Sequence, residues 1–195
     1  MTMDVSPPDP ALTDGVVTVR PWGQPGDADA IVAACNDRAI AEFLDMIPQP
    51  YTRSDADTYL EMCRVGWRDG TFANFAVVID GRAVGSIGVR WKDPDNGVAE
   101  VGYWVAPDAR GTGVCTRALR LVAGWVLTRP GMARLELRAA EENVASQRVA
   151  EKAGFTREGV LRSSHYNARL GRRIDWAMFS LLRGELPQSK AASTH

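Results

Sequence analysis

The stretch RGTGVCT, from Arg110 to Thr116, has the residue types and spacing of an anion-binding turn. Gly111 and Gly113 stand between a run that alternates like a strand and the start of an amphipathic helix. A helix start leaves main-chain N–H groups unpaired, and the helix dipole adds about half a positive charge there. Glycine lacks the Cβ atom that would keep a ligand away. We therefore expect the turn to bind phosphate; the structural alternative is a helix entry that only needs positive φ.

Two known phosphate-binding designs do not fit this turn, in which Arg110 and Arg117 can add cationic contacts. A Walker P-loop requires a lysine after the second glycine, and the sequence has none there. A dinucleotide-binding turn has some support, because Glu136 follows at a suitable distance for a ribose contact. It fails because Thr116 occupies the third glycine position and the remaining chain is too short for a parallel half-sheet.

Composition narrows the class of protein. The chain has 195 residues, and its 23 basic and 24 acidic residues nearly cancel, so we expect neither a nucleic acid nor a membrane as partner. The first residues lack the pattern of a signal peptide, which favours a cytoplasmic protein. Three cysteines without CxxC spacing indicate reduced thiols, and with only two histidines we expect no metal site.

The elements that position the turn follow from periodicity. In the first half of the chain we expect a strand over 16–20, helical patterns over 26–36 and 38–44, and a clearer helix that Ser54 caps, with Asp57 three residues on. Three strands follow, over 72–80, 83–91 and 99–105. In the second half we expect a helix from 114, a strand over 133–139, a helix between Asn143 and Gly154, and strands over 156–163 and 173–182.

The resulting fold class is α+β, one mixed and mostly antiparallel sheet flanked by helices, in the order β-α-α-β-β-β-α-β-α-β-β. The dipeptide Asp80-Gly81 favours a tight hairpin between two of the strands. We expect one domain over 16–186, with a flexible segment over 1–15 and a flexible tail over 187–195.

Longer motifs resemble one family. AEVGYWVAPDARGTGVCTRAL, ENVASQRVAEKAGF, EGVLR and the late Asp175 are similar to the GCN5-related N-acetyltransferases (GNAT), in particular to the RimJ/RimL-like branch, which acetylates protein N-termini and small amines. The likeness covers about Thr18 to Glu185, and the element order is also that of the family's fold. Residues 110–115 match the family motif Q/R-x-x-G-x-G/A, with cysteine in place of a small residue.

The resemblance implies acetyl-CoA as co-substrate, with its pyrophosphate on the turn. The implied cofactor-binding residues are Trp104, Val105, Arg110, Gly111, Thr112, Gly113, Val114, Cys115, Thr116 and Asn143. In the family the third strand separates from its neighbour, and by position the N–H that faces the thioester oxygen belongs to Val105. The alternative for the Trp104 side chain is a core aromatic, and for Asn143 a helix cap.

Acetyl transfer to an amine needs a neutral amine, a stabilised oxyanion and a proton for the thiolate. Glu100 is the candidate for taking the amine proton; the alternatives are binding of the ammonium group and an ordinary ion pair on the sheet. Many relatives carry a tyrosine in the helix after Asn143, which is missing here. The pattern N-x-x-S makes Ser146 the candidate acid, and solvent is the alternative.

The resemblance places the acceptor between segments 42–52 (EFLDMIPQPYT) and 163–173 (SSHYNARLGRR). The letters do not choose among a protein N-terminus, a free amino acid, a polyamine and an aminoglycoside. The expected function is acetyl transfer from acetyl-CoA to a primary amine by direct attack in a ternary complex. The alternative is a catalytically inactive CoA-binding or sensing module. We list a homodimer as an expected assembly.

Overall fold

The computed structural model describes residues 5–186. In chain order its elements are β1 (Leu12–Thr13), β2 (Thr18–Pro21), α1 (Asp27–Cys35), α2 (Arg38–Phe43), α3 (Arg53–Asp69), β3 (Phe72–Ile79), β4 (Arg82–Asp93), β5 (Val98–Val105), α4 (Val114–Leu127), β6 (Arg134–Ala140), α5 (Val144–Ala153), β7 (Thr156–Asn167) and β8 (Arg172–Leu182), with 3-10 turns at Pro107–Ala109 and Arg183–Glu185.

All eight strands form one mixed sheet in the order β1-β2-β3-β4-β5-β6-β8-β7. Every neighbouring pair is antiparallel except β5 and β6, which run parallel. The predicted α+β class and mixed sheet are confirmed. The structure adds the short strand β1, and it has three helices before β3 where the predicted order has two, because 26–36 and 38–44 form separate helices.

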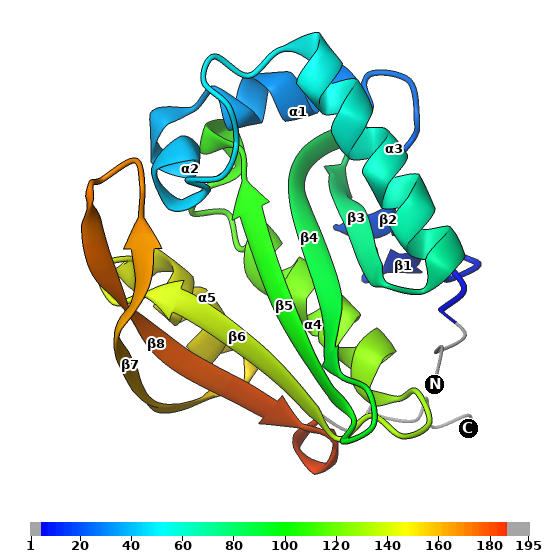
Figure 1. Ribbon diagram of the computed structural model, residues 1–195. Helices are drawn as coiled ribbons and strands as arrows, with labels where there is room; N and C mark the ends of the chain where they lie inside the picture. The colour runs from blue at the N-terminus through cyan, green and yellow to red at the C-terminus, as the bar shows by residue number, and fades with distance from the viewer. Residues whose placement is uncertain (1–4, 187–195) are drawn as a thin grey trace.

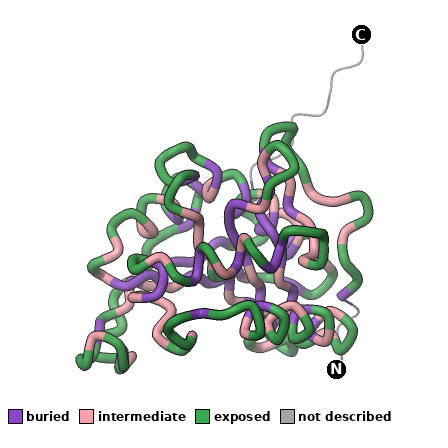
Figure 2. Tube along the Cα trace, turned by 90° about the horizontal axis from the view of Figure 1, so that it is seen from above, coloured by how far each residue is buried: buried purple, intermediate pink, exposed green. Residues whose placement is uncertain are grey.

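Helices cover both faces of the sheet (Figure 1): α1 and α3 lie on one face, and α4 and α5 on the other. The apolar face of α4 includes Val114, Ala118, Val122 and Val126, all buried at helical spacing. Buried residues gather in the middle of the molecule, while the outer sides of the elements are exposed (Figure 2). Because these apolar faces are buried against the sheet, the end of β5 has a fixed position relative to α4, and the end of β6 has a fixed position relative to α5.

Local signals explain most element boundaries. Asp80 and Gly81 both have positive φ, so the predicted hairpin turn is confirmed. Asn143 caps α5 by accepting from the N–H of Ser146, and Gly154 ends that helix with φ +100°. The predicted cap of α3 was wrong, because Thr52 and not Ser54 occupies that position and forms a capping box with Asp55.

Part of the N-terminal segment lies against the sheet. Leu12 and Thr13 pair with β2, and Asp14 forms an ion pair with Arg117 of α4. The domain boundaries proposed at residues 16 and 186 stay predictions, and the expected tail over 187–195 lies outside the described residues. Within residues 5–186, no helix combines the length and apolar character needed to cross a membrane.

Candidate active site

Strands β5 and β6 start side by side and then diverge (Figure 1). Their register runs only from Val98 opposite Arg134 to Val101 opposite Leu137, although β5 continues to Val105. The N–H of Ala106 donates to the carbonyl of Val84 on β4. In an antiparallel ladder alternate residues face the same neighbour, so the main-chain groups of Val105 face away from β4, into the gap. The predicted separation of β5 from its neighbour β6 is therefore present.

The glycine turn opens onto the end of β5. Gly111 and Gly113 have φ values of +76° and +85°, and a Cβ atom added at either would meet nothing within 4 Å. Within residues 5–186, the main-chain N–H groups of residues 111–116 donate to no carbonyl or side chain. Arg117 is the first residue of this stretch whose N–H is paired, with the carbonyl of Gly113. The turn therefore presents a row of unpaired donors at the N-terminus of a helix of fourteen residues.

The two arginines of the turn already have carboxylate partners. Arg110 donates to Asp37 at 2.5 Å and to the carbonyl of Val105 at 3.3 Å, while Arg117 pairs with Asp14 at 2.7 Å. The Arg110 guanidinium lowers the pKa of Asp37. The positive charge of each arginine is therefore partly neutralised, whereas the main-chain N–H groups of residues 111–116 have no partner within residues 5–186.

Other side chains of the turn serve the fold. Val114 is buried in the core, and the hydroxyl of Thr112 donates to the carbonyl of Ala109 at 2.7 Å. Burial raises the pKa of Cys115 to about 12. Its thiol therefore stays protonated near neutral pH, which makes it a poor nucleophile.

Glu100 lies on β5 immediately before the separation. One of its carboxylate oxygens accepts from Arg90 of β4 at 3.0 Å, and the other accepts from Arg138 of β6. The side chain of Glu100 is 20% exposed. The ion pair on the sheet, one of the alternatives expected for Glu100, is thus present, and it involves two guanidinium groups. Any proton that Glu100 accepts weakens both pairs.

Ser146 is in contact with a tyrosine that the sequence analysis did not single out. The hydroxyl of Tyr103 on β5 lies 3.0 Å from Ser146 Oγ and donates to the Ser146 carbonyl at 3.1 Å. Burial raises the pKa of Tyr103. The α5 helix itself has no tyrosine, so the phenol beside Ser146 comes from the neighbouring strand. The sequence contained a signal for this position of Tyr103, because alternation along β5 places its side chain on the face opposite those of Glu100 and Trp104.

Trp104 lies on the other face of β5, toward α1 and α3. Its ring is stacked with that of Trp22, with the ring centroids 6.3 Å apart. It also packs against a buried hydrophobic cluster that includes Ile31 and Ala56. The indole is partly buried. Trp104 therefore takes the position of a core aromatic beside the gap, and its expected cofactor contact stays a prediction.

The two segments expected to surround the acceptor contact each other. Asp45 accepts from the N–H of Ala168 at 2.9 Å and lies 3.3 Å from His165 Nε2. Asn167 donates to the carbonyl of Glu42, 125 residues away in sequence, at 2.8 Å. The end of α2 and the segment that follows it are thus held to the β7–β8 hairpin, at the end of the sheet where β5 and β6 separate.

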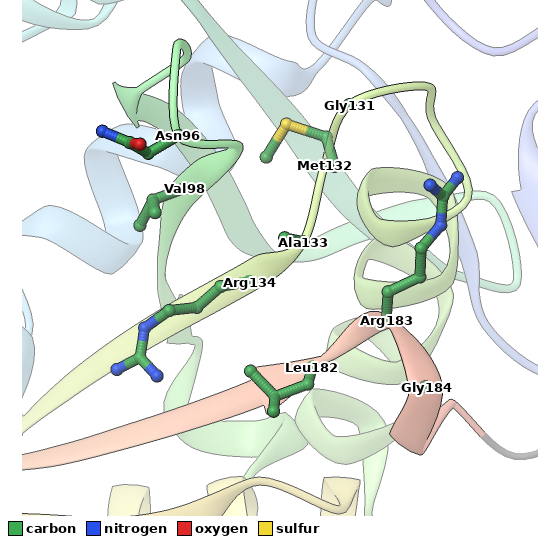
Figure 3. A pocket seen from close by; sticks show the side chains of 9 residues that line it. All are labelled: Asn96, Val98, Gly131, Met132, Ala133, Arg134, Leu182, Arg183 and Gly184. Atoms are coloured by element: carbon green, nitrogen blue, oxygen red, sulfur yellow. The ribbon is translucent and has the colours of Figure 1, made fainter.

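A shallow pocket lies elsewhere (Figure 3). Asn96, Val98, Met132, Arg134 and Leu182 are among its lining residues. Val98 and Arg134 begin β5 and β6, whereas the glycine turn and the separation lie where these strands end. This pocket is therefore at the opposite end of the sheet from the chemistry, and we do not assign the reaction to it.

Comparisons with known proteins agree with this geometry. The family model of the acetyltransferase (GNAT) domain matches residues 17–156. A putative ribosomal N-acetyltransferase, YdaF, of Bacillus subtilis strain 168 is 30% identical over 168 residues, covering 83% of this chain and 89% of the relative. The crystal structure of a probable acetyltransferase is 27% identical, with a TM-score of 0.77 over 88% of this chain and 96% of that one.

A third comparison concerns the fold. Mycobacterium smegmatis RimJ, solved in complex with CoA-disulfide, is 24% identical, with a TM-score of 0.78 over 92% of this chain and 88% of that one. The strand separation and the glycine turn both lie within the residues matched by the family model, and the chain belongs to the acetyltransferase (GNAT) family. It is an N-acetyltransferase, and the resemblance to the RimJ/RimL-like branch is confirmed.

Proposed function

We propose that this protein transfers the acetyl group of acetyl-CoA to a primary amine by direct attack in a ternary complex. The observation that carries the proposal is the combination of the β5–β6 separation with the unpaired N–H groups of residues 111–116. The pyrophosphate occupies the turn, and the pantetheine arm lies in the gap between the two strands. This arrangement directs the thioester toward the amine that enters from the other side.

Three groups have proposed roles in the reaction. The N–H of Val105, which faces the gap, stabilises the oxyanion that forms on the thioester carbonyl. Glu100 takes the ammonium proton, directly or through a water molecule. Ser146 protonates the departing thiolate, and Asn143 contacts the pantetheine while it caps α5. The amine nitrogen forms a bond to the acetyl carbon as the carbon–sulfur bond breaks. The nitrogen then gives up a second proton, which replaces the one that Ser146 gave to the sulfur, and the first proton passes from Glu100 to solvent.

The testing experiment follows thiol release from acetyl-CoA, corrected for hydrolysis, with a panel of amines and short peptides that begin with Ala or Ser. Acetylated product, identified by its mass, together with released thiol supports the proposal. Tight CoA binding without turnover on any amine would instead indicate a CoA-binding or sensing module.

A further inference from the structure

Gly102 lies in the interior of β5, where neither a packing contact nor the backbone conformation requires a glycine. Its φ is outside the left-handed range, and a Cβ atom added there would meet nothing within 4 Å. Gly88, its partner on β4, differs, because a Cβ atom there would collide with Asn74 Oδ1. The β4–β5 register is regular at Gly102, so this residue does not mark a bulge. A strand-interior glycine with neither explanation indicates a place where a ligand approaches closely.

The open space above Gly102 is on the proposed acceptor side of the sheet. Tyr103 contacts Ser146 of α5, so alternation along β5 places Gly102 on the opposite face, together with Glu100 and Trp104. Figure 1 shows α4 and α5 behind β5, with α1 and α3 on the other face. Gly102 itself is exposed. A ligand over Gly102 therefore reaches the gap from the face opposite the proposed cofactor site.

Aromatic side chains border this space toward α1 and α3. Trp104 follows Gly102 on the same face of β5, and we call Trp22, Tyr59 and Trp104 the aromatic wall. The Trp22 indole N–H donates to Ser86 Oγ at 3.4 Å, and the Tyr59 hydroxyl lies 3.3 Å from the same oxygen. Ser86 is buried and lies opposite Trp104 in the β4–β5 register. Because the polar atoms of Trp22 and Tyr59 are directed to Ser86, these two partly exposed side chains offer mainly ring carbons to a ligand.

The same face also carries apolar side chains beyond the β5–β6 separation. The β5–β6 and β6–β8 registers place Met178 and Trp176 of β8 on the face of Gly102. Both side chains are partly exposed, and the Trp176 ring lies edge-on to that of His165, with the ring centroids 5.7 Å apart. Partly exposed apolar groups therefore border the acceptor side on both β5 and β8, as is usual for sites that bind apolar groups.

The carboxylate that β5 carries on this face is engaged. Glu100 is two residues before Gly102, and it accepts from Arg90 of β4 and from Arg138 of β6. An ammonium group that binds to Glu100 would have to displace one of these guanidinium groups. The immediate surroundings of Gly102 on β5 therefore offer apolar ring surface more readily than an unpaired negative charge.

We propose that Gly102 sets the acceptor specificity, because it lets a planar apolar group of the amine lie on β5 beside the aromatic wall. This inference rests on the acetyltransferase function proposed above and adds the substrate class, a primary amine that carries an aromatic ring on a short aliphatic chain. Val105, whose N–H faces the gap, is three residues beyond Gly102, about 10 Å along the strand. A ring between Gly102 and Trp104 can thus be buried while its amino group reaches the thioester.

The test compares 2-phenylethylamine with 2-methoxyethylamine, which has a short polar chain in place of the ring, and with spermidine. Acetyl-CoA is saturating, and the rates are corrected for the fraction of neutral amine. We expect kcat/KM for 2-phenylethylamine to exceed that for 2-methoxyethylamine by about tenfold or more, the lower end of the effect of burying one aromatic side chain. Spermidine should be acetylated no faster than 2-methoxyethylamine.

Variants at Gly102 locate the effect. Gly102→Val fills the space above the strand and should lower the ratio of the two kcat/KM values, for 2-phenylethylamine over 2-methoxyethylamine, about tenfold. Gly102→Ala should lower this ratio less. Alanine and valine suit a strand interior better than glycine, so both variants should unfold at higher urea concentrations, which separates lost specificity from poor folding. The Kd for CoA should stay near the wild-type value, because the change is on the acceptor side.

Gly124→Ala is the matched control for Gly102→Ala. Gly124 also has φ outside the left-handed range and open surroundings, but it lies on α4, on the other face of the sheet. This variant should gain stability as Gly102→Ala does and should leave the ratio of the two kcat/KM values unchanged.

The outcomes separate this inference from the proposed function. Equal kcat/KM for 2-phenylethylamine and 2-methoxyethylamine, a preference for spermidine, or an unchanged ratio in Gly102→Val would overturn the inference and leave the acetyltransferase function standing. Acetylation of the short peptides without acetylation of 2-phenylethylamine would have the same meaning. No acetylation of any amine or peptide, with CoA still bound, would overturn the proposed function itself.

Discussion

The two sides of the β5–β6 separation are built from different kinds of groups. On the proposed cofactor side, the main-chain N–H groups of residues 111–116 are unpaired within residues 5–186, and the nearby arginines are paired with carboxylates. On the proposed acceptor side, side chains make the contacts: those of Asn167 at the end of β7, Arg169 in the β7–β8 turn and Asp45 after α2. A main-chain site depends on a few backbone conformations, whereas a side-chain site changes with each residue. One fold can therefore keep its co-substrate while its acceptor varies.

The largest effect we expect comes from breaking the anchor of α1, which lies on the face of the sheet opposite α4 and the glycine turn. Asp27 is buried, accepts two hydrogen bonds from Arg20 at 2.9 Å, and accepts from the N–H groups of Gly23 and Gln24. Asp27→Asn leaves the largely buried guanidinium of Arg20 without a carboxylate and should lower the free energy of unfolding by about 3–5 kcal/mol. Urea denaturation measures this. Asp29→Asn, at an exposed position of the same helix, should cost less than about 1 kcal/mol.

The same anchor predicts a pH dependence. Burial raises the pKa of Asp27, but the hydrogen bonds from Arg20, Gly23 and Gln24 outweigh it, and the net pKa is lowered. Because the folded pKa lies below the unfolded value of about 3.9, the contribution is complete above that pH and is lost as pH falls through the folded pKa. The difference in stability between the wild type and Asp27→Asn should therefore shrink on acidification. A difference that stays constant down to strongly acidic pH would contradict this assignment.

The next effect concerns the cofactor side. Gly113→Val adds a side chain where φ is +85° and where the ligand must approach the N–H groups, so we expect the Kd for CoA to rise about 100-fold, as for the loss of one or two charge-assisted hydrogen bonds. Calorimetric titration measures it. Gly131→Val is the matched control, because Gly131 has φ +79° and equally open surroundings. Both variants should lose similar stability, but an equal loss of CoA affinity in both would remove the phosphate role of the turn.

The cofactor side was the easier one to predict from the sequence. Glycine spacing, the helix that follows and the alternating strand before it are local signals, and they located the turn and the order of the elements from β3 onward. The cap of α3 shows the limit of such signals, because Thr52 with Asp55 and Ser54 with Asp57 have the same spacing. The side chain of Asn36 favours Thr52, because it donates to the carbonyl and accepts from the N–H of Tyr51, the residue before the cap. These two residues are 15 positions apart in the sequence.

Contacts between distant residues were not predictable in the same way. The pairs Arg110–Asp37 and Arg117–Asp14 join residues 73 and 103 positions apart, and no local pattern indicates such partners. The contact between Tyr103 and Ser146 likewise depends on how α5 packs on β5. The chemistry of the residue types was therefore visible in the sequence, while their partners depended on tertiary packing.

A smaller effect is expected for Glu100, which lies on β5 immediately before the β5–β6 separation. Glu100→Gln should lower kcat by about tenfold at neutral pH, below the usual range for general base catalysis because water can replace the carboxylate, and it should steepen the pH dependence. Glu136→Gln is the matched control, because Glu136 lies opposite Glu100 in the β5–β6 register and also has two cationic partners. Unchanged kinetics of Glu100→Gln across the pH range, or an equal loss in both variants, would contradict a catalytic role.

The smallest effect concerns the proton that the thiolate receives. The single hydrogen of the Tyr103 phenol is donated to the Ser146 carbonyl, so Ser146 Oγ, 3.0 Å away, donates to the phenol oxygen. This hydrogen bond holds the Ser146 hydroxyl in one orientation. Tyr103 is thus a positioning residue, and Tyr103→Phe should slow thiol release about fivefold, the value of one hydrogen bond.

A double-mutant cycle separates this role from a structural one. In the Ser146→Ala background, Tyr103→Phe should have no further effect on kcat, because the hydroxyl that it positions is gone. The KM for acetyl-CoA should stay near the wild-type value in each variant, and urea denaturation monitors any loss of stability. Additive losses in kcat would show that Tyr103 acts independently of Ser146. Full activity of Ser146→Ala would assign the proton to water and remove the role of both residues.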